Sequence, residues 1–233
     1  MPGDQRTYKA MVGGPWVRRW MATGVATAAA ALGGAEGFLV THRTLKMGAE
    51  NETLRARAVR TLYDMRDPVV VGSWRSINDV VMGGCSTGGL MPGEDCAIFK
   101  GVLSTRNNGG FSSIRSPQTD MDLSDSDGIL INCKGDGRLY KLQVCADARS
   151  PGVKYQAEFA PSSEWNEHAV LWSDLKPSMR GVLLEGAPEV SRGEISSFGI
   201  LTSKVTSDGG YNSQFQPGEF ALAIRSISAF QLE

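Results

Sequence analysis

The amino-acid sequence predicts an all-β sandwich or barrel that is preceded by an N-terminal membrane-spanning helix and a short linking helix. Short apolar or alternating runs recur after Pro68, clusters of turn-forming residues separate these runs, and helical periodicity is nearly absent after residue 70. Many short strands without a long helix are typical of a β-sandwich or a β-barrel. We therefore expect an N-terminal arm at residues 1–43, a linker at 44–66 and one β domain at 67–233.

Residues 20–40 form the predicted membrane span. Glu36 is the only charged residue among them, and roughly 20 residues suffice for a helix to cross the hydrocarbon layer. Ala and Gly dominate this stretch, which suits close packing against other transmembrane helices. The residues that would anchor the span at the membrane are Trp16, Arg18, Arg19, Trp20 and Phe38. Positive charge at both ends leaves the orientation open, and a targeting peptide is the alternative for this Ala-rich arm.

The linker at 44–66 has apolar residues at a spacing of four. Leu54, Ala58 and Leu62 lie among charged residues, and this spacing places them on one face of a helix. Pro68 ends the predicted helix, because the residue before a proline is driven out of the helical region. We expect a short amphipathic helix between the arm and the β domain.

The β domain contains a series of short predicted strands. Turn-forming clusters at 107–110, 134–137 and 207–210 separate several of them. The sequence has no repeat of fixed period, so neither a solenoid nor a propeller is expected. The predicted strands are 69–72, 97–103, 111–115, 129–133, 139–145, 155–159, 169–172, 195–202 and 220–232.

Charge and cysteine usage exclude several classes of function. The formal net charge is −1, which gives no reason to expect a nucleic-acid partner. Residues 1–60 hold nine Lys or Arg against four Asp or Glu, so a basic arm precedes a mildly acidic body. The four cysteines form no CxxC pair and have no neighbouring histidine, which favours free thiols over a zinc site. They are Cys85, Cys96, Cys133 and Cys145.

Residues 74–89 are the stretch around which the β domain is organised. A tryptophan precedes Asn78 and Asp79, and two hydrophobic residues and Met82 come next. The glycines that follow permit turn geometries barred to most residues, so we expect a structural corner. Asn78 and Asp79 are predicted to hydrogen-bond the backbone of this turn, and binding of a cation or a partner is the alternative.

An ordered series of motifs resembles the CIA30 family of complex I intermediate-associated proteins. The resemblance extends over nearly the whole β domain, and no single motif carries it alone. The candidate partner-binding or motif residues are Trp74, Asn78, Asp79, Met82, Gly83, Gly84, Ser86, Gly110, Phe111, Arg115, Gly135, Asp136, Gly137, Arg138, Tyr140 and Arg180.

The resemblance implies a jelly-roll β-sandwich that is similar to galactose-binding-like and carbohydrate-binding modules. It also implies protein binding rather than catalysis, in building or supporting a large membrane-bound redox complex. Mitochondrial complex I in the inner membrane is the first choice, and a photosystem of the plastid thylakoid is the second. The predicted span is not part of the family domain and suggests a membrane-resident variant, either a stable subunit or a transient assembly factor.

Two further motifs leave alternatives open. Arg115 either binds a carboxylate on a partner or pairs with Asp79 or Asp136 inside the domain. The Gly-Asp-Gly-Arg sequence within 135–140 matches no established phosphate loop. Because Asp-Gly flanked by alternating apolar residues is a strong hairpin signal, we expect a hairpin turn there.

Aromatic and histidine residues provide little support for catalysis. Trp165 and Trp172 flank His168, and they form either a sugar-stacking platform or, as we favour, part of the packing of the sandwich. His42 is the other histidine, and the chain has no Ser-His-Asp arrangement, HExxH or GxSxG motif. We therefore expect no catalytic, cofactor or metal residues. Docking on a membrane complex is the favoured function, and a carbohydrate- or metal-binding module is the alternative.

Overall fold

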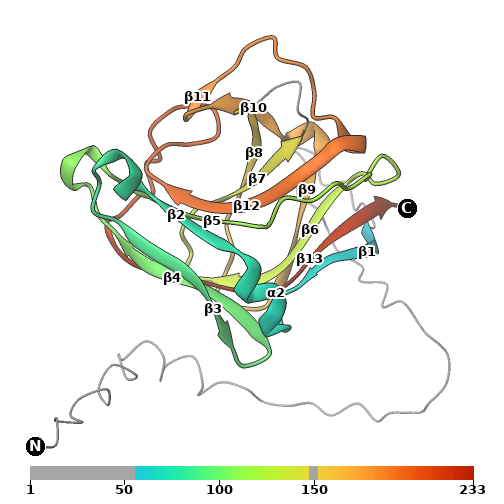
Figure 1. Ribbon diagram of the computed structural model, residues 1–233, viewed down its shortest axis with the longest axis horizontal. Helices are drawn as coiled ribbons and strands as arrows, with labels where there is room; N and C mark the ends of the chain where they lie inside the picture. Colours follow the sequence, from blue (N-terminus) through green and yellow to red (C-terminus); the bar gives the residue numbers. More distant parts are fainter. Residues whose placement is uncertain (1–55, 147–151) are drawn as a thin grey trace, which may run out of the picture. The chain divides into compact units, whose positions relative to one another are not determined.

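The computed structural model describes residues 56–146 and 152–233, which form two antiparallel sheets packed face to face (Figure 1). The predicted all-β sandwich is therefore confirmed. In this part of the chain, no helix combines the length and the apolar character needed to cross a membrane. The predicted span at 20–40 and its anchoring residues Trp16, Arg18, Arg19, Trp20 and Phe38 lie outside the described residues.

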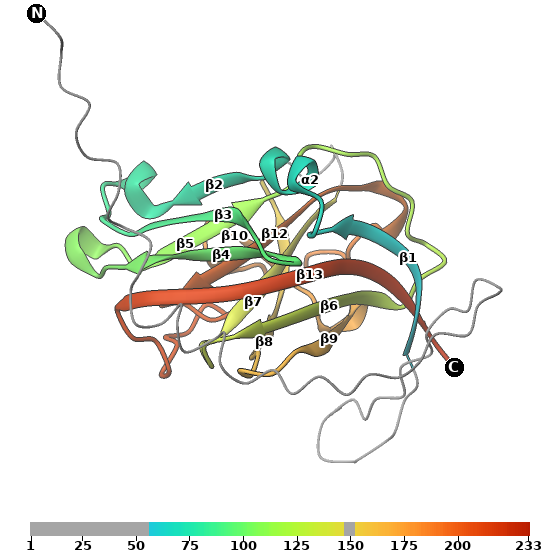
Figure 2. The same ribbon diagram turned by 90° about the horizontal axis from the view of Figure 1, so that it is seen from below.

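One layer, here called the β13 sheet, is built along the longest strand of the described ranges. Strand β13 pairs with β4 through its first half and with β1 through its second half, and β6 pairs with it on the other side (Figure 2). Strand β3 extends the sheet beyond β4, and β9 extends it beyond β6. The strands are β1 (Ala56–Asp64), β3 (Thr87–Gly93), β4 (Cys96–Leu103), β6 (Gly128–Gly135), β9 (Asn166–Leu171) and β13 (Gly218–Leu232).

The second layer, here called the β12 sheet, has the order β11-β10-β8-β7-β12-β5-β2. Strand β2 therefore forms one edge, and β11 forms the opposite edge. In the middle of the sheet, Ile200 lies opposite Ile114 on one side and Leu142 on the other. The strands are β2 (Arg75–Asn78), β5 (Phe111–Arg115), β7 (Tyr140–Ala146), β8 (Lys154–Phe159), β10 (Lys176–Met179), β11 (Val182–Leu183) and β12 (Ile195–Ser203).

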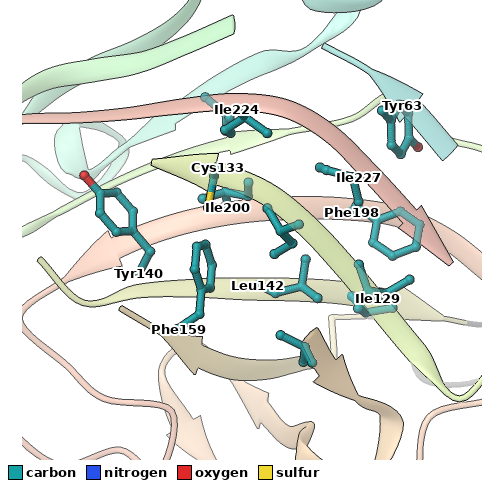
Figure 3. Close-up of a cluster of buried hydrophobic side chains, with 14 of the residues drawn as sticks. Tyr63, Ile129, Cys133, Tyr140, Leu142, Phe159, Phe198, Ile200, Ile224 and Ile227 are labelled. Atoms are coloured by element: carbon teal, nitrogen blue, oxygen red, sulfur yellow. The ribbon is translucent and has the colours of Figure 1, made fainter. Parts of the chain in front are cut away.

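The hydrophobic core lies between the two sheets (Figure 3). Since successive side chains of a strand point to opposite faces, alternate residues of each strand enter the core. Ile224 and Ile227 of β13 face Phe198 and Ile200 of β12, and all four are fully buried. Tyr63 of β1 packs edge-on against Phe198, with ring centroids 6.0 Å apart.

The predicted strand at 69–72 is wrong, because helix α2 (Pro68–Ser73) occupies it. The Asp67 carboxylate accepts a hydrogen bond from the Val69 backbone N–H at 2.8 Å, which caps the first turn. Pro68 stands at the start of the helix, where the absence of its N–H costs nothing. These two local signals outweigh the strand preference of the three valines that follow.

The predicted linker helix is also wrong for residues 56–64, which form strand β1; residues 44–55 lie outside the described ranges. Residues four apart share a face in a strand as well as in a helix, so the spacing of Ala58 and Leu62 fits both. Pairing with β13 favours the strand, and irregularities in register follow Ala58 and Thr61. Consequently Ala58 and Leu62 pack against different hydrophobic clusters.

Four short 3-10 turns accompany the strands within the described residues. Turn η1 follows β2 directly, and η2 precedes β5. Figures 1 and 2 both show these two turns at the same end of the sandwich. The turns are η1 (Asp79–Met82), η2 (Arg106–Asn108), η3 (Trp172–Asp174) and η4 (Arg192–Glu194).

Candidate docking surface at the Asp79 turn

Asp79 is the first residue of η1, and its side chain holds three segments of the chain together. The residue is 1% exposed. Its Oδ1 accepts a hydrogen bond from the Ser86 backbone N–H at 2.8 Å. Its Oδ2 accepts from the N–H groups of Gly110 at 2.6 Å and Phe111 at 3.2 Å. The carboxylate therefore connects η1 to the beginning of β5 and to the residue just before β3.

The surroundings of Asp79 favour its charged form. Burial opposes ionisation, but the hydrogen bonds from Ser86, Gly110 and Phe111 outweigh it, and the pKa of Asp79 lies below its usual value. These hydrogen bonds require the surrounding backbone to lie close to the Asp79 carboxylate. A Cβ added at Gly84 would overlap the Asp79 carboxyl group. This contact explains why glycine occupies position 84.

Asn78 and Ser86 extend the same network through their side chains. The Asn78 Nδ2 donates to the Gly88 carbonyl at 3.0 Å, and its Oδ1 accepts from the Ser112 hydroxyl at 2.7 Å. The Ser86 Oγ accepts from the Ser104 N–H at 2.9 Å and donates to the Ser104 carbonyl at 3.2 Å. Asn78 and Asp79 do bind backbone groups, but only Gly88 and Ser86 of these partners lie within residues 74–89. The other donors to Asp79, at 110 and 111, belong to another segment, so bonding within the turn was only part of the arrangement.

The middle of η1 presents apolar side chains to solvent. Val80, Val81 and Met82 are 60%, 73% and 73% exposed, and we call these three residues the apolar tip. The backbone beneath them is fixed, because the Gly83 N–H donates to the Val80 carbonyl and the Gly84 N–H donates to the Asp79 carbonyl, both at 3.0 Å. Gly83 ends the turn with a φ of 85°, which favours glycine. A buried charge thus supports an exposed apolar turn.

Turn η2 lies beside η1 and adds one cation to this surface. The Asn107 Nδ2 donates to the Gly83 carbonyl at 3.0 Å. Asn107 and Asn108 both have a positive φ, and Lys204 holds Asn108 through its carbonyl and its Oδ1 at 2.8 and 2.7 Å. The side chain of Arg106 is exposed and makes no ion pair or hydrogen bond with another described residue.

A second carboxylate gathers backbone groups at the Gly135–Tyr140 turn. The Asp136 Oδ1 accepts from the Arg138 N–H and from the Tyr140 hydroxyl, both at 3.1 Å. Its Oδ2 accepts from the Ala221 N–H at 2.9 Å and pairs with the Arg138 Nε at 3.3 Å. Arg138 also donates to the Glu219 carbonyl at 2.8 Å. These bonds tie the turn to the beginning of β13.

The predicted hairpin at this turn is wrong. Gly135 ends β6 in the β13 sheet, whereas Tyr140 begins β7 in the β12 sheet, so the turn crosses from one layer to the other. Gly137 supplies the positive φ of 82° that the turn requires. A Cβ at Gly135 would lie 2.5 Å from the Pro161 Cγ. Burial, followed by the nearby Asp136 charge, raises the pKa of Tyr140, which keeps its hydroxyl a donor.

Arg115 pairs with neither of the carboxylates that the sequence suggested. The Asp79 oxygens accept backbone N–H groups, and Asp136 pairs with Arg138. Arg115 lies in β5 near Lys154: burial, followed by this guanidinium, lowers the pKa of Lys154. Binding of a carboxylate on a partner stays a prediction for Arg115.

Two other predicted residues lie away from the Asp79 turn. Trp74 is 7% exposed and belongs to the core, where its ring packs edge-on against Tyr63 with centroids 5.2 Å apart. Arg180 is exposed in the turn between β10 and β11, with a φ of 54°. Neither contributes to the surface at η1.

Trp165 and Trp172 do not form an exposed pair of rings. Trp172 is 8% exposed, and its Nε1 donates to the Ser126 carbonyl at 2.8 Å. The half-buried Trp165 ring is covered by the Arg225 guanidinium, whose Cζ lies 4.0 Å from the ring centroid, and the Lys134 Nζ lies 5.2 Å from it. The packing that we favoured for these residues agrees with this arrangement.

Residues 56–146 and 152–233 contain no group of three or more side chains that could hold a metal ion. Among the described residues, no disulfide joins Cys85, Cys96, Cys133 or Cys145. The sequence indicated Asp79 as a candidate residue. It gave no indication that Val80 and Val81 would be exposed, because their exposure depends on the position of η1 in the fold.

Comparison with protein families gives a match over most of the β domain. A family model described as Complex I intermediate-associated protein 30 (CIA30) matches residues 63–224. An uncharacterised protein of Schizosaccharomyces pombe is 30% identical over an alignment of 176 residues that covers 67% of this chain and 77% of the relative. Both carboxylate turns lie inside the matched family region.

Solved structures with a similar fold include carbohydrate-binding modules of Clostridium thermocellum. A family 11 module in complex with a β-1,3-1,4-mixed-linked tetrasaccharide has a TM-score of 0.53 at 14% identity, covering 74% of this chain and 95% of the module. The family 11 module of a cellulosomal cellulase has a TM-score of 0.53 at 13% identity, and the match covers 73% of this chain and 94% of the module. At such identities the likeness concerns the fold alone.

Proposed function

Because the chain belongs to the CIA30 family, we propose that it is a non-catalytic protein that docks on subunits of a membrane-bound redox complex, as an assembly factor or an accessory subunit. The family's description associates it with complex I intermediates, so mitochondrial respiratory complex I is the first candidate. The place of action would then be the mitochondrial inner membrane. A span at residues 20–40 would anchor the chain there.

One observation carries the proposal: the two motif carboxylates and Arg138 are engaged inside the domain, whereas three consecutive apolar side chains, Val80, Val81 and Met82, are exposed in the described part of the chain. Asp79 and Asp136 accept backbone hydrogen bonds, and Arg138 donates to backbone carbonyls. None of these groups is left to activate a substrate. Exposed apolar side chains on a folded surface are typical of protein interfaces.

The other candidates have less support. A sugar site needs exposed aromatic rings together with convergent polar groups, and the Trp165 ring is covered while Trp172 is buried. The likeness to carbohydrate-binding modules concerns the fold. A plastid photosystem remains the second candidate for the complex, with the thylakoid as the membrane.

The test is native-gel fractionation of detergent-solubilised organelle membranes that contain the full chain. Migration with a respiratory complex in stoichiometric amounts supports an accessory subunit. Migration with smaller, incomplete particles supports an assembly factor, and migration with a photosystem moves the proposal to the plastid. Migration of the chain alone, under conditions that keep the complexes intact, overturns the docking function.

A further inference from the structure

We propose that the apolar tip, Val80, Val81 and Met82, is the anchor through which this chain docks, and that its partner is a protein with an apolar pocket and a carboxylate at the pocket rim. This inference rests on the proposed docking function and names the surface and the partner chemistry. Val81 and Met82 are each 73% exposed, on adjacent positions of one turn.

The tip is preorganised for binding. The Asp79 carboxylate accepts three backbone N–H groups from two segments that follow η1 in the chain, and the Asn107 side chain of η2 donates to the Gly83 carbonyl. The backbone of the tip is therefore ordered before a partner arrives. Ordering a flexible loop on binding costs free energy and reduces affinity. A turn that is already fixed avoids this cost, so its three apolar side chains can bind more tightly.

The tip also differs from the other exposed apolar residues of the described chain. The other exposed large apolar residues come from separate positions in the chain. They are Val69 on α2, Met91 on β3, Val102 on β4, Met179 and Val182, which lie opposite each other in the β10–β11 pair, and Tyr211 between β12 and β13. Val80, Val81 and Met82 are consecutive in the chain. Methionine adapts to irregular apolar surfaces, which suits a side chain at the end of an inserted turn.

Charge indicates the rim of the partner's pocket. Arg106 on η2 is exposed and has no ion pair or side-chain hydrogen bond with a described residue, whereas the Lys204 amine is held by Asn108. The carboxylate beneath the tip, Asp79, is buried. A carboxylate on the partner would complement Arg106 and increase the association rate.

A lipid surface fits the tip less well than a protein pocket. Recognition of anionic lipid by surface charge takes clusters of about 4 to 8 Lys or Arg, and interfacial anchors are enriched in Trp and Tyr. The tip contains no aromatic residue, and Arg106 is the one Lys or Arg of η2. We therefore favour a protein partner, and lipid contact is an outcome that the experiment must be able to detect.

The experiment compares three variants of the full chain. Val81→Asp places a charge in the tip, and Val182→Asp is the matched control, because Val182 is 65% exposed at the opposite edge of the β12 sheet from β2. Arg106→Glu reverses the rim charge. Each variant is tested for thermal unfolding and for the fraction that migrates with the complex on native gels.

Val81→Asp should leave the melting temperature unchanged and reduce the co-migrating fraction about tenfold or more, as expected for an interface hot spot. Arg106→Glu should reduce it severalfold, and Val182→Asp should retain it. If the wild-type chain co-migrates and Val81→Asp does so equally, the tip is not the anchor, although the docking function stands. If the wild-type chain migrates alone, the docking function itself fails. An unaffected Arg106→Glu overturns the carboxylate rim.

Photo-cross-linking distinguishes a protein pocket from lipid. Benzoylphenylalanine is placed at position 81, or at position 182 as control, in the full chain within native membranes. The proposal requires adducts from position 81 to one recurring polypeptide, at a site with a carboxylate nearby, that are absent from position 182. Lipid adducts alone from position 81, or equal polypeptide adducts from both positions, would overturn it.

Discussion

The Asp79 turn and the Asp136 turn are both held by a carboxylate, but they have different roles in the structure. In each, a carboxylate accepts backbone N–H groups from segments far away in the chain. Asp79 is 1% exposed and binds backbone N–H groups with both oxygens. The Asp136 side chain is 20% exposed and shares its oxygens between the backbone, the Arg138 guanidinium and the Tyr140 hydroxyl.

The two turns differ most in what they show to solvent. The Asp79 turn carries the apolar tip, whereas Arg138 in the other turn folds back onto the carbonyls of Gln216 and Glu219. The Asp79 turn exposes an apolar surface, and the Asp136 turn joins the two sheets. Polar motif residues such as Asp79 and Asp136 therefore build the scaffold, whereas Val80 and Val81, which lie between motif residues, are exposed.

The largest expected effect distinguishes the two carboxylates by stability. Asp79→Ala leaves three backbone N–H groups without their acceptor in a buried site, and it should cost about 3 to 4 kcal/mol of unfolding free energy. Asp136→Ala should cost about 1 to 2 kcal/mol, because solvent reaches its site. Urea unfolding of both variants measures this difference. Equal losses would contradict the difference in burial.

The glycines of the two turns sharpen the comparison. Gly84→Ala brings a Cβ into the Asp79 carboxyl group and should cost about 2 to 3 kcal/mol, since the carboxylate must move away from its donors. Gly137 has open space around it and a φ of 82°, so Gly137→Ala should cost only about 1 kcal/mol of backbone strain. Thermal unfolding ranks the two variants, and the reverse order would refute this account of position 84.

The pH dependence of stability reports on Asp79 directly. Its pKa is lower in the folded protein than the value of about 3.9 expected in the unfolded chain, so the unfolded state binds the proton more readily. The stability that comes from the ionised carboxylate is therefore complete above about pH 5 and is lost as the pH falls below about 4. Asp79→Asn should show a weaker loss over this range. If the stability of the wild type and that of the variant fall in parallel as the pH is lowered, Asp79 is not the source of the pH dependence.

The smallest expected effect concerns the contact between η1 and η2. Asn107 donates to the Gly83 carbonyl from an exposed position with a φ of 52°. Asn107→Ala loses this bond and tolerates the positive φ less well, so it should cost about 1 kcal/mol. Asn107→Gly is the control, because glycine removes the bond without the strain. Equal stability of all three proteins would show that η2 does not support the tip.

Alternation along the chain was sufficient to predict much of the fold. The predicted strand at 111–115 coincides with β5, and those at 195–202 and 220–232 lie within β12 and β13. Alternation is clearest at the start of β13, where Phe220, Leu222 and Ile224 are apolar. Strand β3 was missed, since Gly88, Gly89 and Pro92 interrupt its pattern at the sheet edge. The jelly-roll winding and the membrane span stay predictions.

The candidate site was harder to predict than the fold. The tendency of Asn78 and Asp79 to bind backbone follows from their side chains, but the donors Gly110 and Phe111 lie 31 and 32 residues away from Asp79. No local rule selects such partners. In the same way, the two valines after Asp79 resemble core residues in the sequence, and only the position of η1 at the end of the sandwich leaves them exposed.

The measurement that tests the central claim most directly compares Asp136→Ala with the double variant Val81→Ser, Met82→Ser in the full chain. Each protein is assayed for its melting temperature and for the co-migration of its folded fraction with the complex. We predict that Asp136→Ala lowers the melting temperature and retains co-migration, because Asp136 binds Arg138, Tyr140 and Ala221 and not the apolar tip. The double variant should keep the melting temperature and lose co-migration. The opposite pattern would contradict the division between a polar scaffold and an apolar tip for docking.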